Sequence, residues 1–346
     1  MSSLKKTPTI GLIGLGNQGK KHLDSILNLQ GKKLLKLVGV CDTSIKESSS
    51  FMKVPFYLDY KDLYSNAKPE IIVIATPNYL HKQISLDALN ENIHVIKEKP
   101  LATNYLDACD VLKVSHATGR LIATTQQRFF SPLFLKAKTI IPSLGKIISF
   151  AYRFTLNDTA KSWRWDLRKA GGGSWLNMGW HAVSVIQWLI GDIETIELAW
   201  KVNGRREWDY KTDHSSFAKV IVANNIIGSI FLSCIYPKKE EALKIGLSDG
   251  ILYLSRDCLR VLKKGGTQKN YYSTLEEHHI YTDQLKELLK EIQNNNYDQI
   301  RDLRIMATMQ AGINSAYSNS SLINVEKIYK KRQNTFYSDN TIYANF

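Results

Sequence analysis

Cysteine is scarce in this sequence, and no two cysteines have the spacing of a zinc site. The 4 cysteines, Cys41, Cys109, Cys234 and Cys258, lie far apart along the chain. Zinc cages and disulfide frameworks need clustered or regularly spaced cysteines, so neither is predicted. We therefore expect no metal site and a reducing, cytoplasmic environment.

Long hydrophobic runs are also missing. No stretch approaches the length of a transmembrane helix, and the first residues, MSSLKKTPTIGLIG, contain no apolar segment of signal-peptide length. There is no internal repeat and no long low-complexity segment. These absences predict a protein without a membrane partner.

The chain has 346 residues, of which 44% are hydrophobic, which is enough for two domains with proper cores. Its 46 Lys and Arg against 32 Asp and Glu give a net charge of +14, which favours anionic partners such as nucleotides or phosphorylated sugars. The densest basic runs, 327–332 and 263–264, are short and carry no nucleic-acid motif. We expect no nucleic-acid partner.

The first third of the chain alternates short apolar runs with segments of helical period. The expected strands are 10–13, 35–41, 71–75, 93–97 and 121–125. Such alternation is typical of an α/β fold with a parallel, doubly wound sheet. Polar residues at the carboxyl ends of these strands are the first candidates for a ligand site, because open α/β sheets bind their ligands there.

A glycine motif follows the first expected strand and opens a helix. Gly14, Gly16 and Gly19, with Asn17 and Gln18 between the last two, have the spacing of a dinucleotide-binding turn. Asp42 ends the second strand 23 residues after Gly19. Its carboxylate is suited to the ribose hydroxyls and would repel a 2′-phosphate, so NAD is favoured over NADP. Lys46 is the nearest candidate partner for such a phosphate, and Asp42 could also serve simply as a helix N-cap.

The fourth strand, within IHVIKEKPLA, stops at Glu98, Lys99 and Pro100 and carries a lysine to the same edge. A second chemical stretch, 163–191, has three glycines before an amphipathic helix with Ser174 as its expected N-cap. Asn177 and His181 lie four residues apart and should share one face of that helix. Gly179 between them indicates either the approach of a ligand ring to the backbone or close helix packing.

After residue 128 the pattern changes to longer alternating runs. The expected strands are 147–154, 193–202, 217–222, 226–235, 243–247, 251–255 and 259–263, with hairpin turns at 224–225 and 249–250. Two helices, 275–292 and 300–316, follow. We therefore predict a Rossmann domain at 1–128, an α+β substrate-binding and oligomerisation domain with a large, mostly antiparallel sheet at 129–330, and a polar tail at 331–346.

GLGNQG, ATPNYLH and EKPLA, in this order and spacing, resemble the family of glucose-fructose oxidoreductase, inositol dehydrogenase and the rhizopine-catabolism protein, Gfo/Idh/MocA. The resemblance runs to about residue 330 and implies a homo-oligomer built through the second sheet, and often a cis bond before Pro100. The cofactor-binding residues it implies, besides the glycine motif and Asp42, are Thr76, Pro77, Asn78, His81, Glu98, Lys99, Gln127, Trp163 and Arg164. The implied substrate-binding residues are Lys99, Arg128, Asn177 and His181.

The resemblance implies an NAD(P)-dependent oxidoreductase acting on a secondary alcohol of a sugar, cyclitol or nucleotide sugar. His181 would take the hydroxyl proton, Lys99 would stabilise charge on the oxygen, and Asn177 would orient the substrate. At the position of Asn177 the family usually has an aspartate. The amide of asparagine does not carry the negative charge of that aspartate. A glycoside hydrolase that retains NAD and a dinucleotide-sensing regulator are the alternatives. The basic residues Lys161, Arg164, Arg168 and Lys169 indicate an anionic substrate, a cofactor phosphate clamp or a solvated loop.

Overall fold

In a computed structural model of the chain, the described residues are 7–44, 54–158, 163–202, 212–273 and 277–330. The chain forms two compact units. The first comprises residues 1–102, 106–127 and 275–300, and the second comprises 103–105, 128–274 and 301–346. The predicted tail, 331–346, lies outside the described residues. No helix among the described residues is long and apolar enough to cross a membrane.

The first unit is built on a six-stranded parallel sheet with the strand order β3-β2-β1-β4-β5-β6. Its strands are β1 (Thr9–Ile13), β2 (Lys36–Cys41), β3 (Phe56–Tyr57), β4 (Ile71–Ile74), β5 (His94–Lys97) and β6 (Ile122–Thr124). In the central strands β1 and β4 every residue except Thr9 is buried, as expected for a parallel sheet covered on both faces. The order reverses between β1 and β4, so this sheet has its ligand-binding switch point there.

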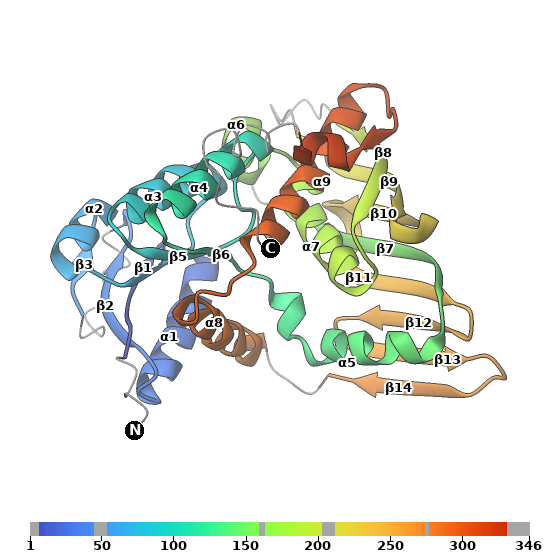
Figure 1. Ribbon diagram of the computed structural model, residues 1–346, viewed down its shortest axis with the longest axis horizontal. Coiled ribbons are helices and arrows are strands. Elements are labelled where there is room, and N and C mark those ends of the chain that lie inside the picture. Colours follow the sequence, from blue (N-terminus) through green and yellow to red (C-terminus); the bar gives the residue numbers. More distant parts are fainter. Residues whose placement is uncertain (1–6, 45–53, 159–162, 203–211, 274–276, 331–346) are drawn as a thin grey trace. The chain divides into compact units, whose positions relative to one another are not determined.

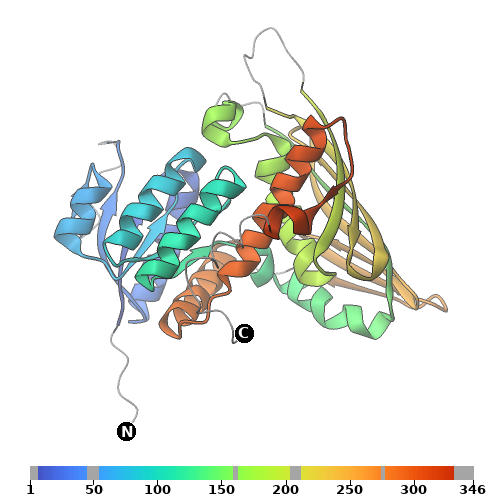
Figure 2. The same ribbon diagram turned by 45° about the horizontal axis from the view of Figure 1, so that its top comes forward.

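Helices cover both faces of this sheet (Figure 1). They are α1 (Asn17–Gly31), α2 (Tyr60–Asp62), which continues as a π-helical turn over Leu63–Ala67, α3 (Asn78–Asn90), α4 (Tyr105–Thr118) and α8 (Glu277–Gln293). Helix α8 lies beside α1 (Figure 2). Its apolar stripe, Leu285, Leu288, Leu289 and Ile292, belongs to the same buried cluster as Ile10 and Ile26.

The position of α8 corrects one sequence-based assignment. Segment 275–300 was expected in the second domain because it follows that domain's strands in the chain, but it packs in the first unit. The physical reason is that α1 and the sheet leave an apolar surface that the α8 stripe buries. The chain therefore returns to the first unit for residues 275–300 and re-enters the second unit at residue 301.

The second unit contains a nine-stranded sheet with the order β14-β13-β12-β11-β7-β10-β9-β8-β15. Its strands are β7 (Ile147–Asn157), β8 (Ile193–Lys201), β9 (Ser215–Val222), β10 (Ile226–Ser233), β11 (Ile235–Leu247), β12 (Gly250–Ser255), β13 (Cys258–Lys263), β14 (Gln268–Tyr272) and β15 (Ile323–Asn324). Among the described pairings, β10 with β7 is parallel and the others are antiparallel. The predicted fold class is confirmed.

Helices α5 (Pro132–Ile140), α7 (Ser174–Leu189) and α9 (Gln299–Tyr317) lie over one face of this sheet (Figures 1 and 2). Alternate residues of each strand face these helices, such as Phe150, Tyr152 and Phe154 of β7. The short helix α6 (Leu167–Ala170) precedes α7. The β9–β10 turn holds Asn224 and Asn225 at φ 65° and 58°, which is the left-handed pair that a tight hairpin needs.

Candidate active site

The three glycines of the motif serve different steric purposes. Gly14 has φ +93°, and a Cβ there would lie 2.7 Å from the backbone oxygen of Ala75. A Cβ at Gly19 would lie 1.9 Å from the backbone oxygen of Gly14. At Gly16 a Cβ would meet nothing within 4 Å. Gly14 and Gly19 therefore permit close packing of the turn, whereas Gly16 is a small residue facing open space, which fits the approach of a pyrophosphate.

Helix α1 begins directly at this open position. Gly16 is its N-cap and offers no side-chain hydrogen bond, and its first turn contains no acidic residue. The first backbone N–H groups of a helix have no partner within the helix, and the helix dipole favours negative charge there. Asn17, the first residue of α1, is exposed. The residues present thus fit a dinucleotide phosphate at the amino end of α1.

Asp42 supports the glycine turn from the end of β2. Its Oδ2 accepts a hydrogen bond from the backbone N–H of Leu15 at 2.7 Å, and its Oδ1 accepts one from Ser44 at 3.0 Å. A carboxylate has about four lone-pair sites, so two bonds leave it capacity to accept ribose hydroxyls. Lys46 lies outside the described residues.

The turn after β4 is tied to the turn after β5 by a buried histidine. His81 is 0% exposed; its Nε2 lies 2.9 Å from the oxygen of Thr76 and its Nδ1 3.3 Å from the oxygen of Pro100. Burial and, next, the charge of Lys97 hold the pKa of His81 well below its ordinary value. The imidazole of His81 is therefore neutral and carries one N–H, so it donates a hydrogen bond to one of these two oxygens and only contacts the other. Asn78, one turn earlier on α3, is 8% exposed. The Oγ1 of Thr76 is buried and has no hydrogen-bond partner among the described residues.

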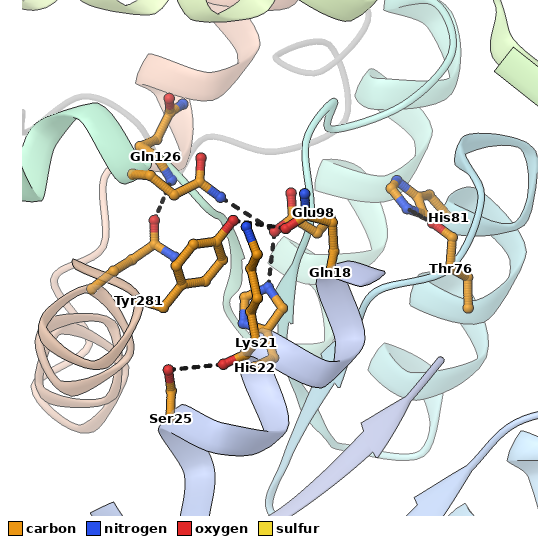
Figure 3. Close-up of polar contacts among 11 residues, drawn as sticks. Gln18, Lys21, His22, Ser25, Thr76, His81, Glu98, Gln126 and Tyr281 are labelled. Atoms are coloured by element: carbon orange, nitrogen blue, oxygen red, sulfur yellow. Dashed lines mark hydrogen bonds and ion pairs between the residues drawn. The ribbon is translucent and has the colours of Figure 1, made fainter. Parts of the chain in front are cut away.

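Lys99 lies at the carboxyl end of β5, half-buried, between Glu98 and a cis bond to Pro100. Glu98 is 7% exposed, and its Oε1 lies 2.8 Å from Nε2 of His22 and 3.3 Å from Nε2 of Gln127 (Figure 3). Burial alone would raise the pKa of Glu98, but the bond to His22 and the charge of Lys99 hold it below its ordinary value. Glu98 is thus an ionised, enclosed carboxylate next to the lysine.

In the second unit, the two polar residues predicted on α7 lie on one face of the helix. Between residues 172 and 186, Asn177 and His181 are half-buried, whereas every other residue is buried. They lie four residues apart and so share one face of the helix. The imidazole of His181 lies edge-on to the ring of Phe154, with 6.0 Å between the ring centroids. An accessible histidine and amide on an otherwise enclosed stretch of helix are candidates for the polar part of a site.

The amino end of α7 corrects the predicted cap. Ser174 does not cap the helix; Asp213, just before β9, does so instead. Its carboxylate accepts hydrogen bonds from the N–H groups of Gly173 at 2.8 Å and Trp175 at 2.7 Å, and from the hydroxyl of Ser174 at 2.6 Å. A Cβ at Gly173 would lie 1.9 Å from the backbone oxygen of Asp213. The glycines before α7 thus allow this close approach of two backbones.

Gly179 supports the packing interpretation rather than the approach of a ligand. A Cβ there would meet the side chains of Met309, Trp175 and Leu232 at 3.1 to 3.3 Å. Trp175 and Trp180 are 1% and 0% exposed and belong to the core. These side chains leave no space for a nicotinamide or substrate ring at Gly179.

Arg128 lies in a buried polar group on the helix-covered face of the second sheet. Its Nε and Nη2 donate to the two oxygens of Glu241 at 2.8 and 2.6 Å. Glu241 also accepts from the hydroxyl of Tyr152 at 2.6 Å. Since Glu241 pairs with Phe154 across β11 and β7, this group lies next to the ring that contacts His181. The structure therefore brings Arg128 near His181.

The predicted loop residues Trp163 and Arg164 form a cation–π pair. The guanidinium carbon of Arg164 lies 5.0 Å from the centroid of the Trp163 ring, and Arg164 is exposed. Lys161 lies outside the described residues. A solvent-exposed guanidinium is chemically suited to contact an anionic group.

Sequence reasoning missed four polar residues that support these sites: His22, Asp213, Glu241 and Tyr281. His22 follows the glycine motif by one helical turn, which is a local signal that could have been used. Asp213, Glu241 and Tyr281 act on residues 38 to 263 positions away. No local pattern indicates such partners.

Two family models match the chain. One, described as the oxidoreductase family with an NAD-binding Rossmann fold, matches residues 9–126. The other, described as the GFO/IDH/MocA C-terminal domain, matches residues 134–253. Together they cover more than half of the 346 residues, and each falls on the unit whose fold it describes.

Characterised relatives match over part of their lengths. Glucose-6-phosphate 3-dehydrogenase of Bacillus subtilis is 28% identical over 206 residues, which are 56% of this chain and 57% of the relative. Inositol 2-dehydrogenase of Salmonella typhimurium is 28% identical over 139 residues, 38% of this chain and 41% of the relative. The chain thus matches about half the length of these relatives.

Solved structures extend the likeness to the whole fold. Levoglucosan dehydrogenase, in complex with NADH and levoglucosan, superposes with a TM-score of 0.85 at 17% identity, covering 92% of this chain and 100% of that chain. At this identity the likeness concerns the fold. With the glycine turn, the strand order and both matched domains, the chain belongs to the Gfo/Idh/MocA oxidoreductase family, and its first unit is an NAD-binding Rossmann domain.

Proposed function

We propose that the protein transfers a hydride between NAD and a secondary alcohol or ketone of a sugar, cyclitol or nucleotide sugar. The observation that carries the proposal is the position of Lys99. It is a half-buried lysine at the carboxyl end of β5, on the sheet edge where the glycine turn and Thr76 also lie. Lysine at this edge supplies positive charge where an oxygen of a substrate acquires negative charge.

The residues that hold the cofactor in this proposal are the glycine turn, Asp42, the turn from Thr76 to Asn78, Glu98, Lys99 and Gln127, with Trp163 and Arg164 from the second unit. His81 contributes by fixing two of these turns, since both of its ring nitrogens contact backbone oxygens. NAD is the preferred form, because the ionised Asp42 would repel the 2′-phosphate of NADP. When bound, NAD supplies the acceptor for the hydride.

The protein residues then divide the remaining chemistry. His181 takes the proton of the substrate hydroxyl. The carbon that bears this hydroxyl loses a hydride in the same step, so the alcohol becomes a ketone. Lys99 donates a hydrogen bond to that oxygen, and Asn177 orients a neighbouring hydroxyl. In the reverse direction His181 returns the proton. The proposal requires Lys99 and His181 to act on one substrate.

The proposed substrate is a polyhydroxylated ring. Two relatives act, by their names, on glucose 6-phosphate and inositol, both of which are such rings. Arg128 is paired in a bidentate geometry with Glu241, which neutralises its charge. We therefore propose that Arg128 contributes a hydrogen-bond donor to the pocket and that an anionic substituent, where present, meets Arg164 instead.

We further propose that a second copy of the chain covers the sheet face opposite α5, α7 and α9. Residues aligned across neighbouring strands on that face include Ile221, Ile227, Ile251 and Leu262. Ile227 is 56% exposed, and Phe217 on the same face is 50% exposed. Exposed apolar side chains on adjacent strands are typical of an interaction surface.

The test is a screen of sugars, cyclitols and nucleotide sugars for NADH formation, with NAD and NADP in parallel. With a substrate in hand, Lys99→Ala should lower kcat, measured at saturating NAD, by at least about 100-fold. Lys36→Ala is the matched control, since that exposed lysine lies at the amino end of β2. Normal turnover by Lys99→Ala would contradict the proposal.

Two other outcomes of this screen would replace the proposed hydride-transfer function with a different function. Release of a sugar from a glycoside without net NADH would indicate a hydrolase that uses NAD transiently. Binding of NADH without turnover of any substrate would indicate a dinucleotide-sensing regulator.

A further inference from the structure

His22 and Glu98 form a buried pair directly behind the lysine turn. His22 lies on α1, one turn after the glycine motif, and is 1% exposed. Its Nε2 is 2.8 Å from Oε1 of Glu98. An ionised carboxylate can only accept hydrogen bonds, so Nε2 of His22 carries the hydrogen. The Nδ1 of His22 is buried without a hydrogen-bond partner, so the bond to Glu98 is the one polar contact that the described residues give this ring.

Helix α8 holds His22 in place from the other side. The ring of Tyr281 lies edge-on to the imidazole of His22, with 5.4 Å between centroids. The hydroxyl of Tyr281 donates to Oε1 of Gln18 at 2.7 Å, and the Nζ of Lys21 lies 5.3 Å from the centroid of the Tyr281 ring (Figure 3). A tyrosine from a distant part of the chain thus contacts both the glycine motif and His22.

The charged and polar groups around Glu98 come from three segments. His22 lies on α1, and Lys99 directly follows Glu98 in the chain. Two uncharged polar residues, Thr125 and Gln127, come from the segment after β6. Burial alone would raise the pKa of this carboxyl, and His22 is the largest influence that lowers it. Without His22, therefore, burial would dominate and Glu98 would take up a proton at a higher pH.

We propose that His22 is a positioning residue for the reaction, which keeps Glu98 ionised and fixed and thereby keeps Lys99 charged and aimed at the substrate oxygen. This inference rests on the proposed function of Lys99. The carboxylate of Glu98 favours the ammonium form of its neighbour, and its fixed side chain restrains the backbone from which Lys99 projects. His81 restrains the other side of that turn through the oxygen of Pro100.

The test compares His22→Leu, which removes the donor, with His22→Gln, whose amide can donate at nearly the same place. His94→Gln is the matched control, because His94 lies at the amino end of β5 while Glu98 follows its carboxyl end. Three quantities are measured for each variant: the pH dependence of kcat/KM, the dissociation constant for NADH, and the NMR titration of the Glu98 side-chain carboxyl carbon in the protein without cofactor, assigned with Glu98→Gln.

In His22→Leu we expect kcat to fall by about 10- to 100-fold at neutral pH, because a misplaced catalytic group costs rates of that order. The acid limb of its profile and the titration of Glu98 should both move to higher pH by at least about one unit. In His22→Gln both should stay close to wild type, with kcat within about threefold of it. His94→Gln should change neither.

An unmoved Glu98 titration in His22→Leu would overturn the inference, as would an equal loss of rate at every pH in both His22 variants. The second result would show a purely structural role. The NMR titration does not depend on turnover, so it separates failure of this inference from failure of the proposed function, which is decided by Lys99→Ala.

Discussion

At the scale of single residues, substitutions in the glycine motif should affect folding at one position and cofactor binding at another. A methyl group at Gly16 meets open space, whereas one at Gly19 meets the backbone of Gly14 at 1.9 Å. We predict that Gly16→Ala folds normally but binds NADH at least about 10-fold more weakly, because the methyl group occupies the place of the pyrophosphate. Gly19→Ala should lose about 1 to 3 kcal/mol of unfolding free energy as well.

Urea unfolding and NADH fluorescence titration check this pair. Gly31→Ala is the control, since a Cβ at this glycine also meets nothing within 4 Å and lies at the far end of α1. Equal NADH affinity in Gly16→Ala and Gly31→Ala would contradict the assignment of the phosphate site.

Glu241 predicts a pH-dependent contribution to stability. Burial would raise the pKa of its carboxyl, but Arg128 and the hydroxyl of Tyr152 hold it below its ordinary value in the folded protein. The unfolded chain then binds the proton more readily, so the contribution is present above the ordinary pKa of about 4.5 and is lost as pH falls through the lower folded value.

Glu241→Gln should therefore lower the free energy of unfolding by about 3 to 5 kcal/mol at pH 7, because it leaves the Arg128 charge buried without its partner. The difference from wild type should shrink as the pH falls below 4.5 and the wild-type carboxylate is protonated. Urea unfolding across this range measures it. The neighbouring Glu240, whose side chain is 44% exposed, is the control, and Glu240→Gln should change stability by less than about 1 kcal/mol.

Local spacing predicted the residues that periodicity governs. Asn177 and His181 share an accessible face because they lie one helical turn apart, and the three glycines of the motif have the separate steric environments that their spacing implies. Ser174 was wrongly predicted as a cap because the actual cap, Asp213, is 39 residues distant from it. The sequence around α7 contains no trace of that partner.

At the scale of elements, Asp213 determines how α7 begins. Removing its carboxylate takes the acceptor from the buried N–H groups of Gly173 and Trp175, and it removes the 2.6 Å hydrogen bond of the Ser174 hydroxyl. We predict that Asp213→Ala lowers the free energy of unfolding by at least about 2 kcal/mol, the upper end of the range for helix caps. Because Asn177 and His181 project from the first turns of this helix, kcat should fall too.

Asp166→Ala provides the comparison, since Asp166 caps the short, partly exposed helix α6 through the N–H of Arg168. Its loss should cost about 1 kcal/mol or less. Equal stabilities of the two variants in urea unfolding would contradict the special role of Asp213.

Element types followed from hydrophobic pattern, but several lengths did not. Alternation predicted β12 and β13 within about one residue. The first half of β11 was missed because residues 235–240 are all exposed and carry no alternation. Its pairing with β7 is irregular there, with Ile235 opposite Asn157 and consecutive pairing beginning only at Glu240. Strand β14 was missed for the same reason, since its residues are mostly exposed and polar.

At the scale of the whole molecule, the exposed sheet face predicts self-association. Ile227→Lys places a charge in the middle of the aligned apolar residues and should convert an oligomer into smaller species, because a buried unpaired charge is costly. Leu135→Lys is the control: Leu135 is 45% exposed, but it lies on α5, which covers the opposite face of the sheet.

Light scattering coupled to size-exclusion chromatography measures the molar mass of each form. A monomeric wild type, or an unchanged mass for Ile227→Lys, would contradict the proposed interface.

The two-unit organisation was only partly predictable. The change of pattern near residue 128 agrees with the start of the long second-unit segment at Arg128. The return of 275–300 to the first unit was not predicted, because an amphipathic helix shows that it buries one face and does not show against what. Such long-range choices depend on the shape of a surface assembled from several segments.

The central claim is that Lys99 and His181 act together on one substrate, and a double-mutant cycle on kcat tests it most directly. Lys99→Ala and His181→Ala should each lower kcat by at least about 100-fold, and the double variant should be less than about 10-fold slower than the worse single variant, because groups that act as a unit are strongly non-additive. A double variant slowed by the full product of the two single effects would show independent action and contradict the account.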